Sequence, residues 1–101
     1  MKNSLFAVRF QDDQGRHETR RKYLKAHIEW LDQNSEHVLV GGSLRKEPDE
    51  MPVGGLWIVK AASKEAVESL IKTDPFWQHR LRSSVEILYW SKAFSDREVP
   101  V

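Results

Sequence analysis

The order in which apolar residues change their spacing is the sequence feature that most constrains the fold. Some segments place apolar residues at every second position, as strands do, and others at every third or fourth position, as helices do. The expected strands are residues 4–10, 37–40, 56–61 and 85–90, and the expected helices are residues 16–34 and 63–73. This order predicts an α+β, ferredoxin-like βαββαβ fold, with two helices on one face of a four-stranded antiparallel sheet.

Length and composition narrow the classes of protein to which the chain can belong. Its 101 residues suit a single domain over residues 1–101, with a polar C-terminal tail from about residue 95. The 16 basic and 15 acidic residues form no long run of one sign, which argues against a nucleic-acid partner. The absence of cysteine excludes disulfides and thiolate metal sites.

The chain carries no recognisable signal for secretion or membrane insertion. Its first residues lack the apolar segment of a signal peptide. No apolar run approaches the roughly 20 residues that a membrane-spanning helix needs. We therefore expect a soluble, cytoplasmic protein with no membrane partner. Because a chain this short leaves much of its surface exposed, pairing into a homodimer would stabilise it.

The first expected helix carries a histidine within its apolar stripe. Leu24, His27, Ile28 and Leu31 follow the i, i+3, i+4, i+7 spacing of one helical face. We expect these four residues on the buried side of the helix and Arg20 on the side that faces water.

His27 and Asp74 each have a structural and a catalytic interpretation. His27 can be a core histidine whose ring nitrogens find hydrogen-bond partners, or a general acid or base, since imidazole exchanges protons near neutral pH. Asp74, which precedes a proline, can be a turn former, or the carboxylate that orients the imidazole. No two histidines have the helical spacing of metal ligands, so no metal site is predicted.

The two glycine pairs mark the ends of expected strands. Gly41-Gly42 should end the second strand, and Gly54-Gly55 should lead into the third. The charged segment between them, residues 43–53, is expected to be a surface loop that is long enough to cover a site. Trp57 and Trp90 are candidates for the sheet face that the helices leave open, which a second copy of the chain could cover.

Four further residues are candidates for substrate binding. Ser43 offers a hydroxyl beside a glycine pair, where a ligand could approach the backbone. Arg9 interrupts an apolar strand and either binds an anion in a cleft or lies at an exposed strand end. Trp57 and Phe76 would supply apolar walls for a pocket, or simply belong to the core.

The order and spacing of these motifs resemble the YCII-related (YciI-like) family. The motifs are Ala26-His27-Ile28-Glu29-Trp30-Leu31, Gly41-Gly42, Gly54-Gly55-Leu56-Trp57-Ile58-Val59 and Asp74-Pro75-Phe76. The resemblance spans roughly residues 5–94 and implies a dimeric α+β barrel built from ferredoxin-like chains. It also implies a site with a His–Asp pair at His27 and Asp74.

The family resemblance leaves the reaction open. One characterised branch removes chloride from a chlorinated hydroxyhydroquinone and needs no cofactor. This sequence has Gly42-Ser43 where many relatives have Gly-Pro, and a longer charged loop follows. These departures leave the substrate of this chain undetermined.

Two hypotheses about function follow. In the first, the chain is a cofactor-independent enzyme of the lyase, isomerase or dehydrochlorinase type, and His27 moves a proton on a small cyclic or aromatic substrate. In the second, it is a non-catalytic dimeric module that binds a small-molecule ligand or a protein, and His27 is structural. An open pocket that contains both His27 and Asp74 would favour the enzyme, and a filled core would favour the module.

Overall fold

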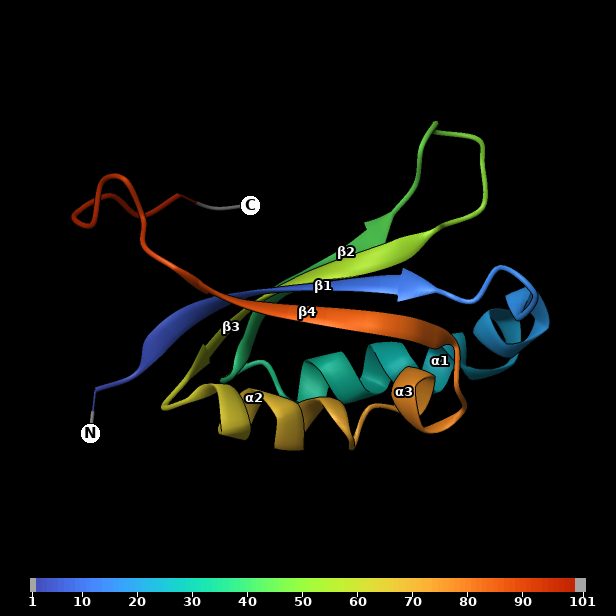
Figure 1. Ribbon diagram of the computed structural model, residues 1–101, viewed down its shortest axis with the longest axis horizontal. Coiled ribbons are helices and arrows are strands. Elements are labelled where there is room, and N and C mark those ends of the chain that lie inside the picture. The colour runs from blue at the N-terminus through green and yellow to red at the C-terminus, as the bar shows by residue number, and fades with distance from the viewer. Residues whose placement is uncertain (1, 100–101) are drawn as a thin grey trace.

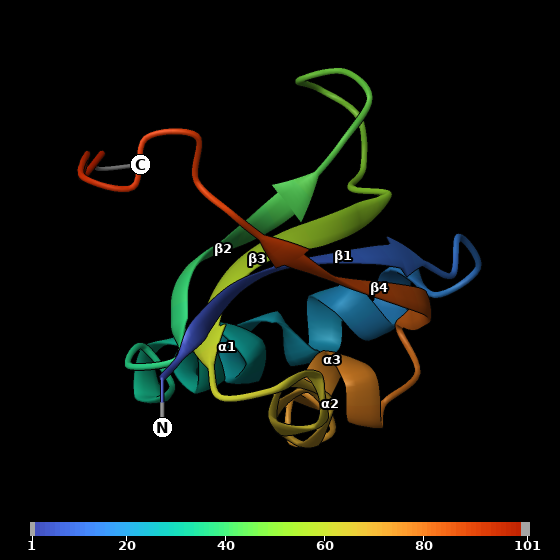
Figure 2. The ribbon, with the colours of Figure 1, turned by 60° about the vertical axis from the view of Figure 1, so that its left-hand side comes forward.

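The computed structural model describes residues 2–99 of the chain. Its elements are β1 (Ser4–Asp12), α1 (His17–Gln33), β2 (Val38–Leu44), β3 (Gly54–Ala61), α2 (Lys64–Ile71), α3 (Pro75–Gln78) and β4 (Arg82–Trp90). The strands form one antiparallel sheet in the order β2-β3-β1-β4. All helices of the described chain lie on one face of this sheet (Figures 1 and 2). The predicted α+β, ferredoxin-like fold is confirmed, with α3 as a short addition after α2.

The two ends of the predicted domain, residue 1 and residues 100–101, lie outside the described residues. Between residues 91 and 99 the tail contains no helix or strand. Within residues 2–99, no helix has both the length and the apolar character needed to cross a membrane.

The sheet face that the helices cover holds the core. Its buried sheet residues are Phe6, Val8 and Phe10 of β1, Val38 of β2, and Trp57, Val59 and Ala61 of β3. The two-residue period of β1 therefore separates buried from less buried positions, as predicted. Trp57 pairs with Val8 and lies on this covered face, so its placement on the open face is wrong. Trp90, the other candidate, does lie on the open face and is exposed.

The open face of the sheet is largely apolar. Its residues include Leu5 and Ala7 of β1, Leu56 and Ile58 of β3, and Leu88 and Trp90 of β4. Of the tail, Val99 lines a cavity on this face together with Leu5 and Trp90. Much of the face stays exposed, including Leu56 and Leu88.

All four strands extend further than predicted: β3 begins at Gly54 and β4 at Arg82, and β1 and β2 end later. β1 continues past Phe10 to Asp12, which occupies the next position of the buried face. The carboxylate of Asp12 can be buried there because it pairs with Arg20 and Arg82. β2 does not end at Gly41-Gly42 but continues through them to Leu44, paired with β3. Glycine suits this position because a Cβ at Gly41 would lie 3.0 Å from Cδ1 of Trp57.

The buried side of α1 differs from the predicted one. Leu24 and Ile28 are 43% and 54% exposed, and Arg20 is buried, so these three predictions are wrong. The buried residues of the helix are Arg20, His27 and Trp30, which recur every three to seven positions. Arg20 and His27 form hydrogen bonds with Asp12 and Asp74 beneath the helix. The helix is therefore rotated so that Leu24 and Ile28 of its apolar stripe are exposed. The prediction for His27 is confirmed.

Two side-chain caps set the beginnings of α2 and α3. The hydroxyl of Ser63 accepts a hydrogen bond from the backbone N–H of Ala66 at 3.1 Å, as expected for an N-cap. The carboxylate of Asp74 accepts one from the N–H of Phe76 at 3.1 Å. Pro75 occupies the first helical position, where its missing N–H costs nothing. Asp74 is therefore fixed at the start of α3, with its carboxylate pointing into the protein.

Candidate functional site

The site is built around a hydrogen bond between His27 of α1 and Asp74 at the start of α3. Nδ1 of His27 lies 2.7 Å from Oδ1 of Asp74. Asp74 is fully buried, and His27 is 6% exposed. An ionised carboxylate can only accept hydrogen bonds, so the imidazole proton lies on Nδ1. In the neutral ring, Nε2 is then free to accept a proton.

The second nitrogen of the ring remains within reach of solvent. Nε2 of His27 has no hydrogen-bond partner within residues 2–99, and it is not one of the fully enclosed side-chain atoms that lack a partner. By contrast, Oδ2 of Asp74 is enclosed and has no partner in the same part of the chain. Nε2 of His27 is therefore the nitrogen of the pair that lies toward solvent.

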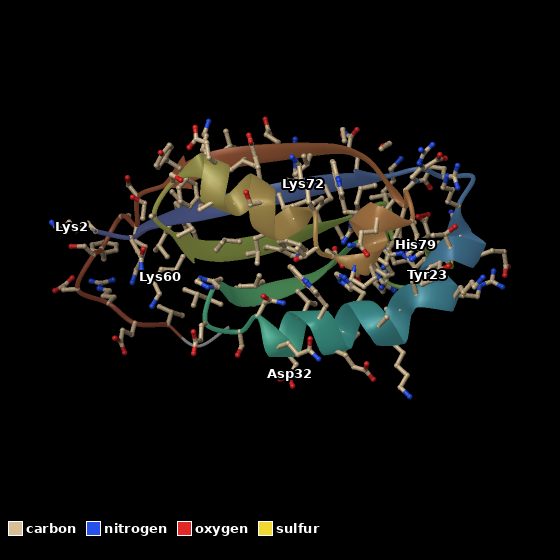
Figure 3. The ribbon with its side chains drawn as sticks, turned by 90° about the horizontal axis from the view of Figure 1, so that it is seen from below. Lys2, Tyr23, Asp32, Lys60, Lys72 and His79 are labelled. Carbon is tan, nitrogen blue, oxygen red and sulfur yellow. The ribbon has the colours of Figure 1, made fainter. Side chains whose placement is uncertain are left out.

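Packing between α1 and α3 brings the pair together. The rings of Tyr23 and His79 stack with centroids 3.6 Å apart and planes 3° from parallel. Figure 3 shows these two side chains meeting where α1 passes α3. Nε1 of Trp30 also donates a hydrogen bond to Oγ1 of Thr73 at 2.9 Å, one turn along α1 from His27. These contacts hold His27 opposite Asp74, although 47 positions of sequence separate them.

Aromatic rings surround the imidazole. Phe76 stacks on His27 with centroids 3.9 Å apart and an interplanar angle of 10°. Trp57 lies further away, at 6.4 Å. Both residues are almost completely buried. The predicted apolar neighbours, Trp57 and Phe76, thus lie beside His27.

A buried cluster of three charged residues lies next to the pair. Nη1 of Arg82 donates to Oδ1 of Asp12 at 2.7 Å, and Nη2 of Arg20 donates to Oδ2 of the same carboxylate. The three residues come from the end of β1, the first turns of α1 and the start of β4. A register shift between Gln11 and Asp12 places Asp12 opposite Arg82.

The charged groups of this cluster interact electrostatically with the His–Asp pair. Burial lowers the pKa of the Arg82 guanidinium below its usual value. The hydrogen bond and charge of Asp12, and the charge of Asp74, act in the opposite direction, while the charge of Arg20 lowers the pKa further. Both guanidinium carbons also lie near the Phe76 ring, at 5.1 Å for Arg20 and 5.2 Å for Arg82. The four charged groups and His27 therefore form one electrostatic unit.

Ser43 lies near this unit, and Arg9 does not. Ser43 pairs in register with Gly55, so both face the helix side of the sheet, where a Cβ on Gly55 would lie 3.1 Å from Nη2 of Arg82. The exposed hydroxyl of Ser43 accepts a hydrogen bond from Arg45 at 3.0 Å. Arg9 projects from the opposite face of the sheet, where it forms an exposed ion pair with Glu86 at 3.3 Å.

The larger cavities of residues 2–99 do not reach the His–Asp pair. Five cavities of about 220–490 Å³ are lined by residues other than His27 and Asp74. Residues 45–53 of the β2–β3 loop, expected as a cover for a site, project away from the helix layer (Figure 1). Within residues 2–99 no three His, Cys, Asp or Glu side chains are grouped closely enough to hold a metal ion.

Sequence reasoning missed Asp12, Arg20 and Arg82. Asp12 continues the alternation of Phe6, Val8 and Phe10 by one more buried position, which was a usable signal. Arg20 is seven positions before His27, on the same side of the helix. Arg82 gave no signal, because a register shift aligns it with Asp12.

Comparisons with known proteins support the fold and the family. Residues 4–91 match the sequence profile of the YCII-related domain. Among solved structures, 5-chloro-2-hydroxyhydroquinone dehydrochlorinase from Burkholderia phenoliruptrix, in complex with 2,5-dihydroxybenzoquinone, is 24% identical. The match covers 86% of this chain and 93% of that chain, with a TM-score of 0.78.

A second solved structure shows the same fold at greater distance. It is a candidate antibiotic biosynthesis monooxygenase from Bacteroides thetaiotaomicron, 21% identical, with a TM-score of 0.59. That match covers 98% of this chain and 97% of the other. No curated protein matches the sequence. At these identities the two structures establish the shared fold alone.

Proposed function

The chain belongs to the YCII-related family, and on that premise we propose that it is an enzyme in which His27 is the general acid and base. Nε2 of His27 removes a proton from a hydroxyl group or ring carbon of a small cyclic substrate and returns it at another position. Asp74 holds the ring and balances the charge of the imidazolium that forms. The chemistry needs no cofactor, because one residue both accepts and donates the proton.

The hydrogen bond of 2.7 Å between Nδ1 of His27 and Oδ1 of Asp74 is the observation that carries this proposal. It fixes the tautomer that leaves Nε2 able to accept a proton, as the carboxylate of a catalytic triad does for its histidine. Nε2 has no partner within the described residues and is not one of their enclosed atoms, so it is free to meet a substrate.

A flat, hydroxylated ring is the substrate class that we propose. Phe76 and Trp57 form the apolar surroundings of the imidazole, which suit an uncharged ring. The structurally similar dehydrochlorinase from Burkholderia phenoliruptrix acts on 5-chloro-2-hydroxyhydroquinone, and its structure was solved in complex with 2,5-dihydroxybenzoquinone. We propose the same class of molecule for this chain, without assigning removal of chloride.

Proton exchange at a ring carbon tests the proposal directly. The protein is incubated in D₂O with 1,2,4-trihydroxybenzene or its 5-chloro derivative, and NMR follows loss of the ring protons. The wild-type chain should accelerate exchange over buffer, and His27→Gln should lose about 10²–10⁴-fold of that acceleration. His37→Gln, which changes an exposed histidine, should keep it. Equal rates for wild type and His27→Gln would refute the catalytic role of His27.

A second function, that of a non-catalytic binding module, is favoured by the burial of the pair. His27 is 6% exposed, and the five cavities noted above lie elsewhere. In that case His27→Gln would lower the free energy of unfolding and leave any ligand's affinity unchanged. Exchange that depends on His27 in a folded variant would instead support the enzyme.

We also propose that the chain forms a homodimer through the open face of its sheet. Exposed apolar residues of β3 and β4, such as Leu56 and Leu88, lie on that face, and a second copy would bury them. Leu88→Asp should therefore convert a dimer into a monomer in sedimentation velocity. Leu24→Asp changes an equally exposed leucine on α1 and should leave the dimer intact. A monomeric wild-type chain at high concentration would contradict this proposal.

A further inference from the structure

The buried cluster at the start of α1 contains one more positive charge than its carboxylate balances. Asp12 is shared by Arg20 and Arg82, so the three formal charges sum to one positive charge. The side chain of Arg82 is only 2% exposed. Burying a second guanidinium is costly, because ions lose their hydration in the interior. The remaining positive charge is balanced by Asp74 of the neighbouring pair.

The hydrogen-bonding groups of Arg82 are only partly used. Nη1 donates to Asp12, and Nε is enclosed without a partner within residues 2–99. Nη2 also has no partner in that part of the chain, but it is not one of the enclosed atoms. An accessible donor on a guanidinium that is otherwise buried is suited to an anionic acceptor.

Gly55 lets the guanidinium of Arg82 lie directly against the sheet. A Cβ at Gly55 would lie 3.1 Å from Nη2 and 3.2 Å from Nη1 of Arg82. Any residue larger than glycine at position 55 would place side-chain atoms against the guanidinium. Phe10 lies on the same guanidinium, with its ring centroid 4.5 Å from the guanidinium carbon, so the group cannot swing far from its position.

Arg82 and His27 meet around one aromatic ring. The centroid of the Phe76 ring is 3.9 Å from that of His27 and 5.2 Å from the guanidinium carbon of Arg82. His27 and Arg82 therefore both lie against Phe76.

We propose that Arg82 is an oxyanion-binding residue of this site and selects substrates with an acidic hydroxyl group, that is, phenols and enols. This inference rests on the proposed function of His27. The O–H bond of the substrate breaks, the proton moves to Nε2 of His27, and the electron pair stays on the oxygen. The resulting oxyanion accepts a hydrogen bond from Nη2 of Arg82.

The charge balance of the site suits this step. With His27 neutral, the two arginines balance Asp12 and Asp74. Proton transfer from the substrate adds one positive charge on His27 and one negative charge on the substrate oxygen, so the site stays neutral overall. Binding a neutral ring without a hydroxyl group would leave the free donor of Arg82 without an acceptor.

Binding of 4-nitrophenol tests the inference, because its phenolate absorbs visible light and its neutral form does not. The wild-type chain should bind the phenolate more tightly than the neutral phenol, so the bound probe should ionise at lower pH than the free probe. Arg82→Met should reduce this preference by about 10–100-fold, the range for a hydrogen bond to a charged group. Arg20→Met removes only a charge of the cluster, so it should reduce the preference less than Arg82→Met, which removes both a charge and the donor.

A second variant tests the position of the guanidinium. The Cβ in Gly55→Ala would crowd Nη1 and Nη2 alike, so the variant should weaken phenolate binding while the circular dichroism spectrum stays unchanged. The inference is overturned if the wild-type chain shows no preference for the phenolate. It is also overturned if Arg20→Met and Arg82→Met reduce the preference equally.

The phenolate-binding test and the proton-exchange test can fail independently, because they depend on different residues. Phenolate binding that depends on Arg82, together with proton exchange that is independent of His27, would support the oxyanion site and refute the catalytic role. Exchange that depends on His27, with phenolate binding that is independent of Arg82, would do the reverse.

Discussion

Asp12→Ala is expected to lower the free energy of unfolding by about 3–5 kcal/mol, the cost of leaving buried charge without its partner. Asp12 accepts from both Arg20 and Arg82, and all three side chains are almost completely removed from water. Its loss leaves two guanidiniums close together with no carboxylate between them. Urea unfolding followed by tryptophan fluorescence measures the effect, since Trp30 and Trp57 lie in the core.

A neighbouring aspartate provides the matched control. Asp13 forms an ion pair with Arg16 in which both side chains are about half exposed, and such pairs contribute little. Asp13→Ala should therefore shift the unfolding midpoint far less than Asp12→Ala. Similar midpoints for the two variants would show that the cluster of Asp12, Arg20 and Arg82 does not stabilise the fold.

Asp74→Asn is expected to reduce the rate of proton exchange by about 10²–10⁴-fold while the chain stays folded. Oδ1 of Asp74 accepts from both the N–H of Phe76 and Nδ1 of His27, and the side-chain oxygen of asparagine at that position can keep both hydrogen bonds. The amide carries no negative charge, so the imidazolium that forms during proton transfer loses the carboxylate that balances its charge.

Nitrogen NMR shifts of the His27 ring show which nitrogen carries the proton, and the exchange assay gives the rate. The proton should lie on Nδ1 in both the wild-type chain and Asp74→Asn, so a slower rate in the variant reports the lost charge. Because the two residues act as a unit, the double variant with His27→Gln should be hardly slower than the worse single variant. An unchanged rate in Asp74→Asn would show that Asp74 only caps α3.

Much of the fold follows from local patterns in the chain. The alternation of Phe6, Val8 and Phe10 marks a strand, and the structure places these residues in the core. Ser63 marks the beginning of α2 by its capping hydroxyl. Such signals are local, since they depend on neighbouring backbone groups or on a fixed repeat along the chain.

The candidate site was only partly visible from local patterns. His27 stood out by its place in an apolar stripe, and Asp74 by its place before a proline. Their distance of 2.7 Å depends on how α1 packs against α3, through contacts such as that between Tyr23 and His79. Neither residue carries a signal for the other.

By itself, the sequence determined the order of strands and helices, the residues that alternate along β1, and the presence of His27 on a buried helix side. Only the tertiary structure decided that Arg20 is buried while Leu24 is exposed. Periodicity identifies a buried face from the apolar residues that share it. A charged residue can also be buried, if it forms a hydrogen bond with a charged partner there. Arg20 and Arg82 find that partner in Asp12, and the bond between Asp12 and Arg82 spans 70 positions of the chain. Pairing over such a distance is set by packing and register, which no local pattern encodes.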